Sequence, residues 1–122
     1  MAKPPEPLAE LIPEASLIVF AVVVAVLSVG PKPPPPPHAA ELPKGATGVG
    51  YQSASQKVRL RIERVLKGHT AAREIEVEKP VAPYLLEVGN KGPFFLDAQG
   101  KIIGRYGPDT HREDEIIQAL HP

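Results

Sequence analysis

The 122-residue chain has no cysteine and no tryptophan, and its charges cancel. Without cysteine it has no disulfides, no thiolate metal ligands and no cysteine nucleophile. Its 14 Lys and Arg residues balance 14 Asp and Glu residues, whereas proteins that wrap nucleic acid or bind anionic membranes usually carry a basic excess. One methionine and 16 prolines are typical of a thermophile protein. Composition therefore disfavours several functions and assigns none.

One uncharged run, Leu17–Val29, interrupts this proline-rich chain. As a helix it would span about 20 Å, less than the roughly 30 Å of a bilayer core. Seven of its residues are β-branched, which favours a strand. Ahead of it Lys3 stands among Glu6, Glu10 and Glu14, which is not the basic start of a signal peptide. We predict a strand, no membrane span and a cytoplasmic location, with an exported domain as the alternative.

Fully extended, the run would reach about 43 Å, more than twice the length of an ordinary strand. We expect it to bend, or to break in two, near Ala21 or Ala25, where small side chains allow close approach. Both of its faces are apolar, and a small barrel with a helix on its outside would cover both. An outer face left bare would instead indicate a homodimer.

The rest of the chain divides at clusters of proline and glycine, and we predict a single domain over residues 1–122. Its segments are a helical lead-in at 4–14, the long first strand at 15–30, a Pro/Gly-rich loop at 31–55, the remaining strands at 56–106 and a C-terminal helix at 109–121. Asp97–Gly100 is expected to be a hairpin turn with Gly100 in the left-handed conformation. The final helix is expected to start at Asp109 or Thr110 and to bury Ile116, Ile117 and Leu120.

Two neighbouring segments alternate apolar residues with charges of opposite sign. Lys57, Arg59 and Arg61 alternate with Val58, Leu60 and Ile62, while Glu74, Glu76 and Glu78 alternate with Ile75 and Val77. We predict an antiparallel pair that places Lys57 opposite Glu78, Arg59 opposite Glu76 and Arg61 opposite Glu74. In that register the acidic strand neutralises the basic one, and both apolar sets share the other face.

The segment Val58–Gly68 (VRLRIERVLKG) resembles the second strand and turn of netrin-like OB-fold domains, the β-barrels of the tissue inhibitors of metalloproteinases and their bacterial relatives. Val88-Gly89 and Phe94–Leu96 resemble a later strand. The resemblance implies a mainly β fold, a small five- to six-stranded OB-like Greek-key barrel with a short N-terminal helix and a C-terminal helix. Protease inhibition in that family uses a cysteine near the mature N-terminus. This chain has none, so the barrel carries over and the inhibition does not.

A second resemblance is local. Residues Gly92–Tyr106 with the final helix are similar to the end of a thioredoxin-like domain. That fold needs a helix between its early strands and usually a CxxC motif, and the sequence provides neither. A thioredoxin-like domain lacking redox cysteines is therefore kept as an alternative.

The predicted contact surface consists of Lys44, Tyr51, Lys57, Arg59 and Arg61, on the long loop and the adjacent strand. On an OB-like barrel a basic stripe suggests single-stranded nucleic acid. The acidic neighbouring strand and the scarcity of aromatics disfavour that alternative. We therefore predict a binding or interaction module for a protein or small ligand.

No catalytic pattern competes with this interpretation. In Lys44–Gly50 the lysine precedes the glycines and no helix follows, unlike a phosphate loop. The histidines are scattered, and Asp109, His111 and Asp114 are the sole local group with metal-ligand chemistry, too sparse to predict a site. We predict no metal, no cofactor and no enzymatic activity.

Overall fold

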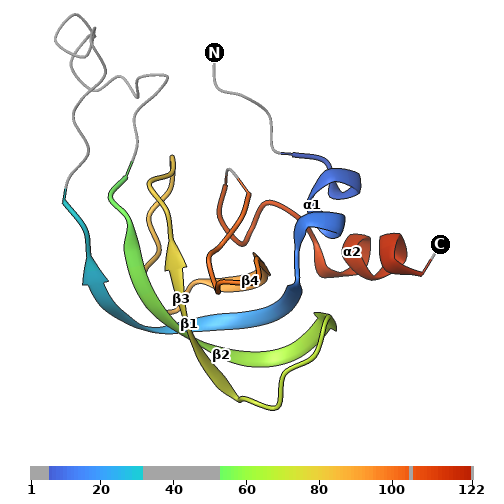
Figure 1. Ribbon diagram of the computed structural model, residues 1–122, viewed down its shortest axis with the longest axis horizontal. Coiled ribbons are helices and arrows are strands. Elements are labelled where there is room, and N and C mark those ends of the chain that lie inside the picture. The colour runs from blue at the N-terminus through green and yellow to red at the C-terminus, as the bar shows by residue number, and fades with distance from the viewer. Residues whose placement is uncertain (1–5, 32–52, 105, 122) are drawn as a thin grey trace, which may run out of the picture.

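The computed structural model describes residues 6–31, 53–104 and 106–121. Its elements are α1 (Leu8–Glu14), β1 (Leu17–Val29), β2 (Gln56–Lys67), β3 (Glu74–Lys79), β4 (Lys91–Leu96) and α2 (Glu113–Leu120). The four strands form one antiparallel sheet in the order β3-β2-β1-β4 (Figure 1). The predicted mainly β fold with a helix near each end is therefore confirmed.

The apolar run is one continuous strand. β1 pairs with β2 from Ile18 to Val29 and with β4 from Leu17 to Val22. Its register with β2 shifts at four places, two of them at Ala21 and Ala25. Such irregularities bend a strand and increase its twist, and β1 and β2 curve together around the interior in Figure 1. The strand therefore bends, as expected, without breaking.

Two apolar clusters hold the fold. The first, which we call the inner cluster, consists of Val19, Ala21, Val23, Val58, Leu60, Val77, Leu86, Phe94, Leu96 and Ile102. The outer cluster joins both helices to the sheet and consists of Leu11, Ala15, Ile18, Phe95 and Ile116. Both faces of β1 are thus covered near its start, whereas Leu27 and Val29 at its end are exposed.

Basic side chains on β2 fasten both helices to the sheet. Lys67 Nζ donates hydrogen bonds to the carbonyls of Ile12 at 2.6 Å and Ala15 at 2.8 Å, at the C-terminal end of α1. Arg64 Nε bonds Glu113 Oε2 at 2.7 Å, at the N-terminal end of α2. Lys67 is a cation at the partly negative C-terminal end of α1, and Glu113 is an anion at the partly positive N-terminal end of α2, so each charge opposes the dipole of its helix. These helices are too short to be stable alone, so they depend on such contacts.

The expected strand count is not reached in the described residues, which form four strands instead of five or six. Residues 101–106 were expected to form a strand, but the described residues of this stretch make only single bridges, Lys101 parallel to Glu78 and Ile102 antiparallel to Leu96. Gly104 then takes a φ of 102° and turns the chain away from the sheet. The edges of the sheet, β3 and β4, are therefore joined only by this short stretch.

The C-terminal helix starts later than expected, at Glu113. Thr110 does not cap it, because its Oγ1 donates to the Gly107 carbonyl at 2.7 Å inside a preceding turn. Ile116 is buried as expected, but Ile117 is 42% exposed. No helix in the described part of the chain is long and apolar enough to cross a membrane.

Candidate functional site

The outward face of β2 and β3 carries the charged residues that the sequence singled out. The predicted register is confirmed, with Lys57 opposite Glu78, Arg59 opposite Glu76 and Arg61 opposite Glu74. Not every pair of facing residues in this register forms an ion pair. Glu76 binds both Arg59, at 3.2 Å, and Lys57, at 4.0 Å, while Arg61 forms no ion pair within the described residues.

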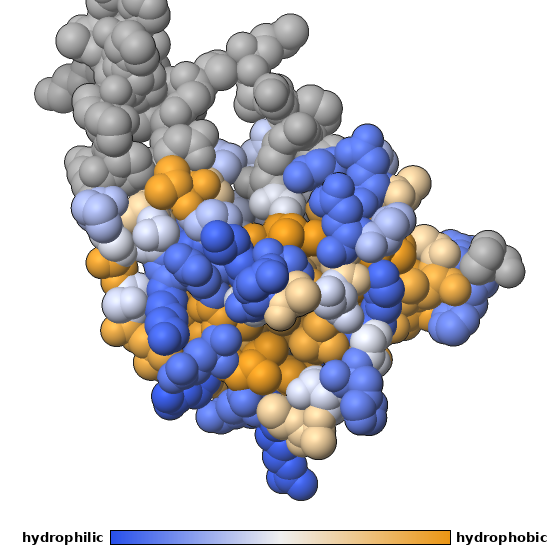
Figure 2. All heavy atoms as spheres, viewed as in Figure 1, coloured by the Kyte–Doolittle hydropathy of each residue, from blue (hydrophilic) through white to orange (hydrophobic). Residues whose placement is uncertain are grey.

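Exposed ion pairs of this kind contribute only about 0.2–1 kcal/mol each. These side chains therefore add little to stability and are free to exchange their partners for groups on another molecule. In the side of the molecule seen in Figure 2, hydrophilic residues cross the middle of the surface, and hydrophobic residues show between and beside them. A ligand of mixed polarity suits such a surface better than a uniformly anionic one.

A polar hollow of about 350 Å³ adjoins this face where the long loop leaves the sheet. It is lined by Ser28, Val29, Gly30, Ser55, Gln56, Lys57 and Glu78. The Gly30 amide donates to the Ser55 carbonyl at 2.8 Å, which closes the base of the loop. Lys44 and Tyr51 lie outside the described residues, so their part in this surface stays a prediction.

Lys79, the last residue of β3, is the least expected charged residue of the structure. Its side chain is fully buried, and its Nζ donates to the Tyr84 carbonyl at 2.7 Å and lies 5.1 Å from the centre of the Tyr84 ring. Burial lowers the pKa of the Lys79 ammonium and raises the pKa of the Tyr84 hydroxyl. A lysine with no access to solvent has no access to a substrate, so this pair has a structural role.

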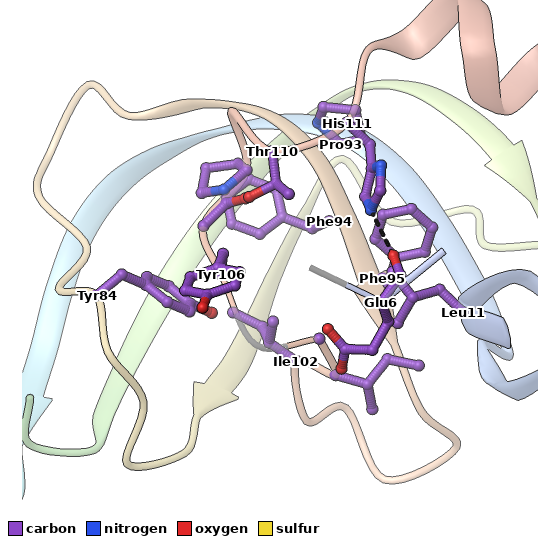
Figure 3. Close-up of a pocket in the computed structure, with 14 residues that line it drawn as sticks. Glu6, Leu11, Tyr84, Pro93, Phe94, Phe95, Ile102, Tyr106, Thr110 and His111 are labelled. Atoms are coloured by element: carbon purple, nitrogen blue, oxygen red, sulfur yellow. Dashed lines mark hydrogen bonds between the residues drawn. The ribbon is translucent and has the colours of Figure 1, made fainter. Parts of the chain in front are cut away.

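A small cavity lies beside Tyr84, among Phe94, Phe95, Ile102 and His111 (Figure 3). Its volume of about 20 Å³ is enough for about one water molecule. His111 Nε2 lies 3.0 Å from the Glu6 carbonyl, and its ring meets Phe95 edge to face at 6.0 Å. His111 thus ties the N-terminal segment to the sheet, and the cavity is too small for a substrate.

The side chains of Asp109, His111 and Asp114 do not come together as a metal site. Asp114 Oδ2 accepts a hydrogen bond from Arg112 at 2.8 Å, and His111 contacts the Glu6 carbonyl. Within the described residues no three His, Asp or Glu side chains gather as metal ligands would.

The buried lysine predicts a specific dependence of stability on pH. Because its pKa in the folded protein is below the ordinary value of 10.5, the unfolded chain binds more protons between those two values, and stability rises with pH across that window. The raised pKa of Tyr84 acts in the opposite sense above its ordinary value of 10.0. Lys79→Met is expected to abolish the rise.

Urea unfolding at several pH values between about 7 and 10 measures this effect. At neutral pH the Lys79→Met change should stay within about 2 kcal/mol, because the lost hydrogen bond is offset by no longer burying an ammonium. Lys57→Met removes an exposed lysine and serves as the control, which should keep the alkaline rise. An unaltered rise in Lys79→Met would contradict the assignment.

No protein-family model, curated protein or solved structure matches the chain. The resemblance to netrin-like OB-fold domains therefore stays a prediction. The function has to be argued from the surface of the molecule alone.

Proposed function

We propose that the chain is a non-catalytic recognition module built on an OB-like barrel, and that the outward face of β2 and β3 contacts a protein partner. The strand order supports the barrel. Residues 100–103 bond to β3 through Glu78 and to β4 through Phe95 and Leu96, which is where the last strand of an OB-type barrel would lie. A thioredoxin-like domain is less well supported, because all four described strands pair antiparallel.

The observation that carries the proposal is the mixed-charge face beside the polar hollow. Lys57 belongs to both, since it lines the hollow and reaches Glu76 on the face. In OB-type barrels this face and the loop after the first strand form the usual contact surface. Interspersed charges of both signs favour a protein partner with a matching pattern, and such contacts set specificity and association rate.

Site-specific crosslinking in cells of the native host tests the proposal. A photoreactive benzophenone side chain replaces Arg61, which is exposed and forms no ion pair among the described residues. We expect one defined protein adduct in the cells. The same adduct, formed in a cell lysate, should weaken when about 0.5 M salt screens the charges.

The same photoreactive group at Gln118, on the exposed side of α2, is the matched control. It should give no such adduct. Equal adducts at both positions, or none at Arg61, would contradict the proposal.

The alternative of single-stranded nucleic acid is favoured by the basic residues on β2. It is opposed by the three glutamates opposite them in register. Fluorescence anisotropy with a labelled dT oligonucleotide at low salt separates the two. A salt-sensitive affinity in the micromolar range, lost in Arg61→Glu, would replace the protein partner by nucleic acid.

A further inference from the structure

The connection between β3 and β4, residues 80–90, exposes three large apolar side chains. Val81 is 48% exposed, Leu85 50% and Val88 65%, and they are three of the seven large apolar residues exposed in the described part of the chain. We name these three residues the apolar ridge. Single exposed apolar residues are ordinary, but three of them on one short segment make that segment a candidate interaction site.

Hydrogen bonds at Ala82 and Leu86 anchor the backbone of the ridge. Ala82 exchanges two backbone hydrogen bonds with Ser53, at 2.7 and 3.3 Å. The buried Gln56 side chain exchanges two with the Leu86 backbone, both at 2.9 Å. Buried anchors thus alternate with exposed ridge residues, as in a strand. A surface ordered before binding loses little conformational entropy when a partner docks.

A cleft of about 290 Å³ opens beside the ridge. Tyr84, Leu85 and Leu86 form one wall, and Gly107, Pro108 and Asp109 belong to the other side, with Asn90 and Lys91 also lining it. Pockets for small metabolites usually measure roughly 300–1,000 Å³, so this cleft suits one large side chain. Leu85 belongs to both the ridge and the cleft, which makes them one continuous surface.

Two exposed carboxylates belong to this surface among the described residues. Glu87, between the ridge residues Leu85 and Val88, is exposed, and Asp109 lines the cleft. Neither forms an ion pair within the described residues. Lys91 is the one cation among the described residues of the cleft lining, and its Nζ already lies 3.8 Å from Glu63.

We propose that the apolar ridge and its cleft dock a basic segment of a partner protein, one that inserts a large aliphatic or aromatic side chain beside Tyr84 and places Lys or Arg against Glu87 and Asp109. A desolvated apolar anchor in a pocket with charged groups at its rim is the usual arrangement of an interface hot spot. A second copy of the chain fits less well, because a two-fold contact here would bring the same unpaired carboxylates together. This surface is separate from the β2 and β3 face, and the proposal does not depend on that face.

Selection from a random dodecapeptide library displayed on phage tests the chemistry of the partner. The immobilised full chain is the target, and a Leu85→Ser/Asp109→Asn variant is used for counter-selection. We expect the enriched peptides to combine a large aliphatic or aromatic residue with neighbouring Lys or Arg. A synthetic peptide of the enriched sequence should bind the double variant at least tenfold more weakly.

Amide chemical shifts in NMR locate the binding of that peptide. Perturbations are expected at residues 84–91 and 107–109, and not along β2. Val65→Ser is the matched control, because Val65 is an exposed apolar residue of β2, and it should bind the peptide as the wild type does. All substituted side chains are at the surface, so unchanged spectra elsewhere verify the fold.

Three results would overturn the proposal. One is a selection that yields no peptides specific for the wild type, or yields acidic ones. Another is a set of perturbed amides away from the ridge and cleft. The third is a dimer, detected by light scattering of the free protein, that Leu85→Ser converts to a monomer, because the ridge would then be an interface between copies.

Discussion

Ile18→Ala is expected to lower the free energy of unfolding by about 2–5 kcal/mol, with a fall of roughly 10 °C or more in Tm. Ile18 is fully buried, and it packs with Leu11 and Ala15 on the N-terminal side and Ile116 of α2. Shortening it removes apolar contact from both helices at once and leaves a cavity between them and β1. The helices should therefore lose protection in hydrogen exchange before the sheet does.

Ile117→Ala is the matched control for this substitution. The side chain chemistry is identical, but Ile117 is largely on the solvent side of α2, so the loss should stay within about 0.5 kcal/mol. Urea unfolding of both variants gives the comparison. Similar losses in the two variants would mean that Ile18 does not connect the helices to the sheet.

The sequence was sufficient for the parts of the fold that depend on periodicity. Alternation of apolar and charged residues on two segments predicted the β2 and β3 register, and the structure confirms it residue by residue. An uncharged β-branched run predicted β1, which spans Leu17–Val29. A one-residue slip would have turned every side chain to the wrong face, which is why such patterns specify register strongly.

Features set by contacts between distant residues could not be predicted in the same way. The sequence around Asp109 and Thr110 has good capping residues, yet the helix begins at Glu113, where Arg64 of β2 binds it. Thr110 uses its hydroxyl in the turn that precedes the helix, and a contact from a distant strand holds the first residue of the helix instead. Residues 101–106 likewise have strand-forming side chains, but Gly104 and the following turn end their pairing after Ile102.

The candidate sites also differ in whether a periodic pattern in the sequence predicts them. Lys57, Arg59 and Arg61 were identified because charge and periodicity place them on one face. The alternation of β3 also continues to Lys79 and puts it inward, a signal that was available but overlooked. The apolar ridge carries no periodic signal, because Pro80 and Pro83 interrupt the pattern. Hydrogen bonds to distant residues, among them Ser53 and Gln56, give it a defined shape.

Gly68→Ala is expected to destabilise the protein by about 2–5 kcal/mol, through two separate effects. Gly68 follows β2 with a φ of 86°, a left-handed conformation that side chains with a Cβ disfavour. A Cβ at this position would also overlap the Ser16 carbonyl oxygen and lie 3.3 Å from Leu17 Cα. The backbone at the start of β1 would have to move, although the adjacent Lys67 is bonded to Ile12 and Ala15.

Gly89→Ala separates the two effects. Gly89 has a comparable φ of 98°, but no atom of the described residues beyond its two chain neighbours lies within 4 Å of a Cβ placed there. Its substitution should therefore show the conformational strain alone, about 1–2 kcal/mol. Urea unfolding of both variants measures the difference. Equal losses of unfolding free energy in the two variants would show that the turn after β2 does not press against the start of β1. A larger loss in Gly68→Ala would place the tight contact between this turn and the start of β1.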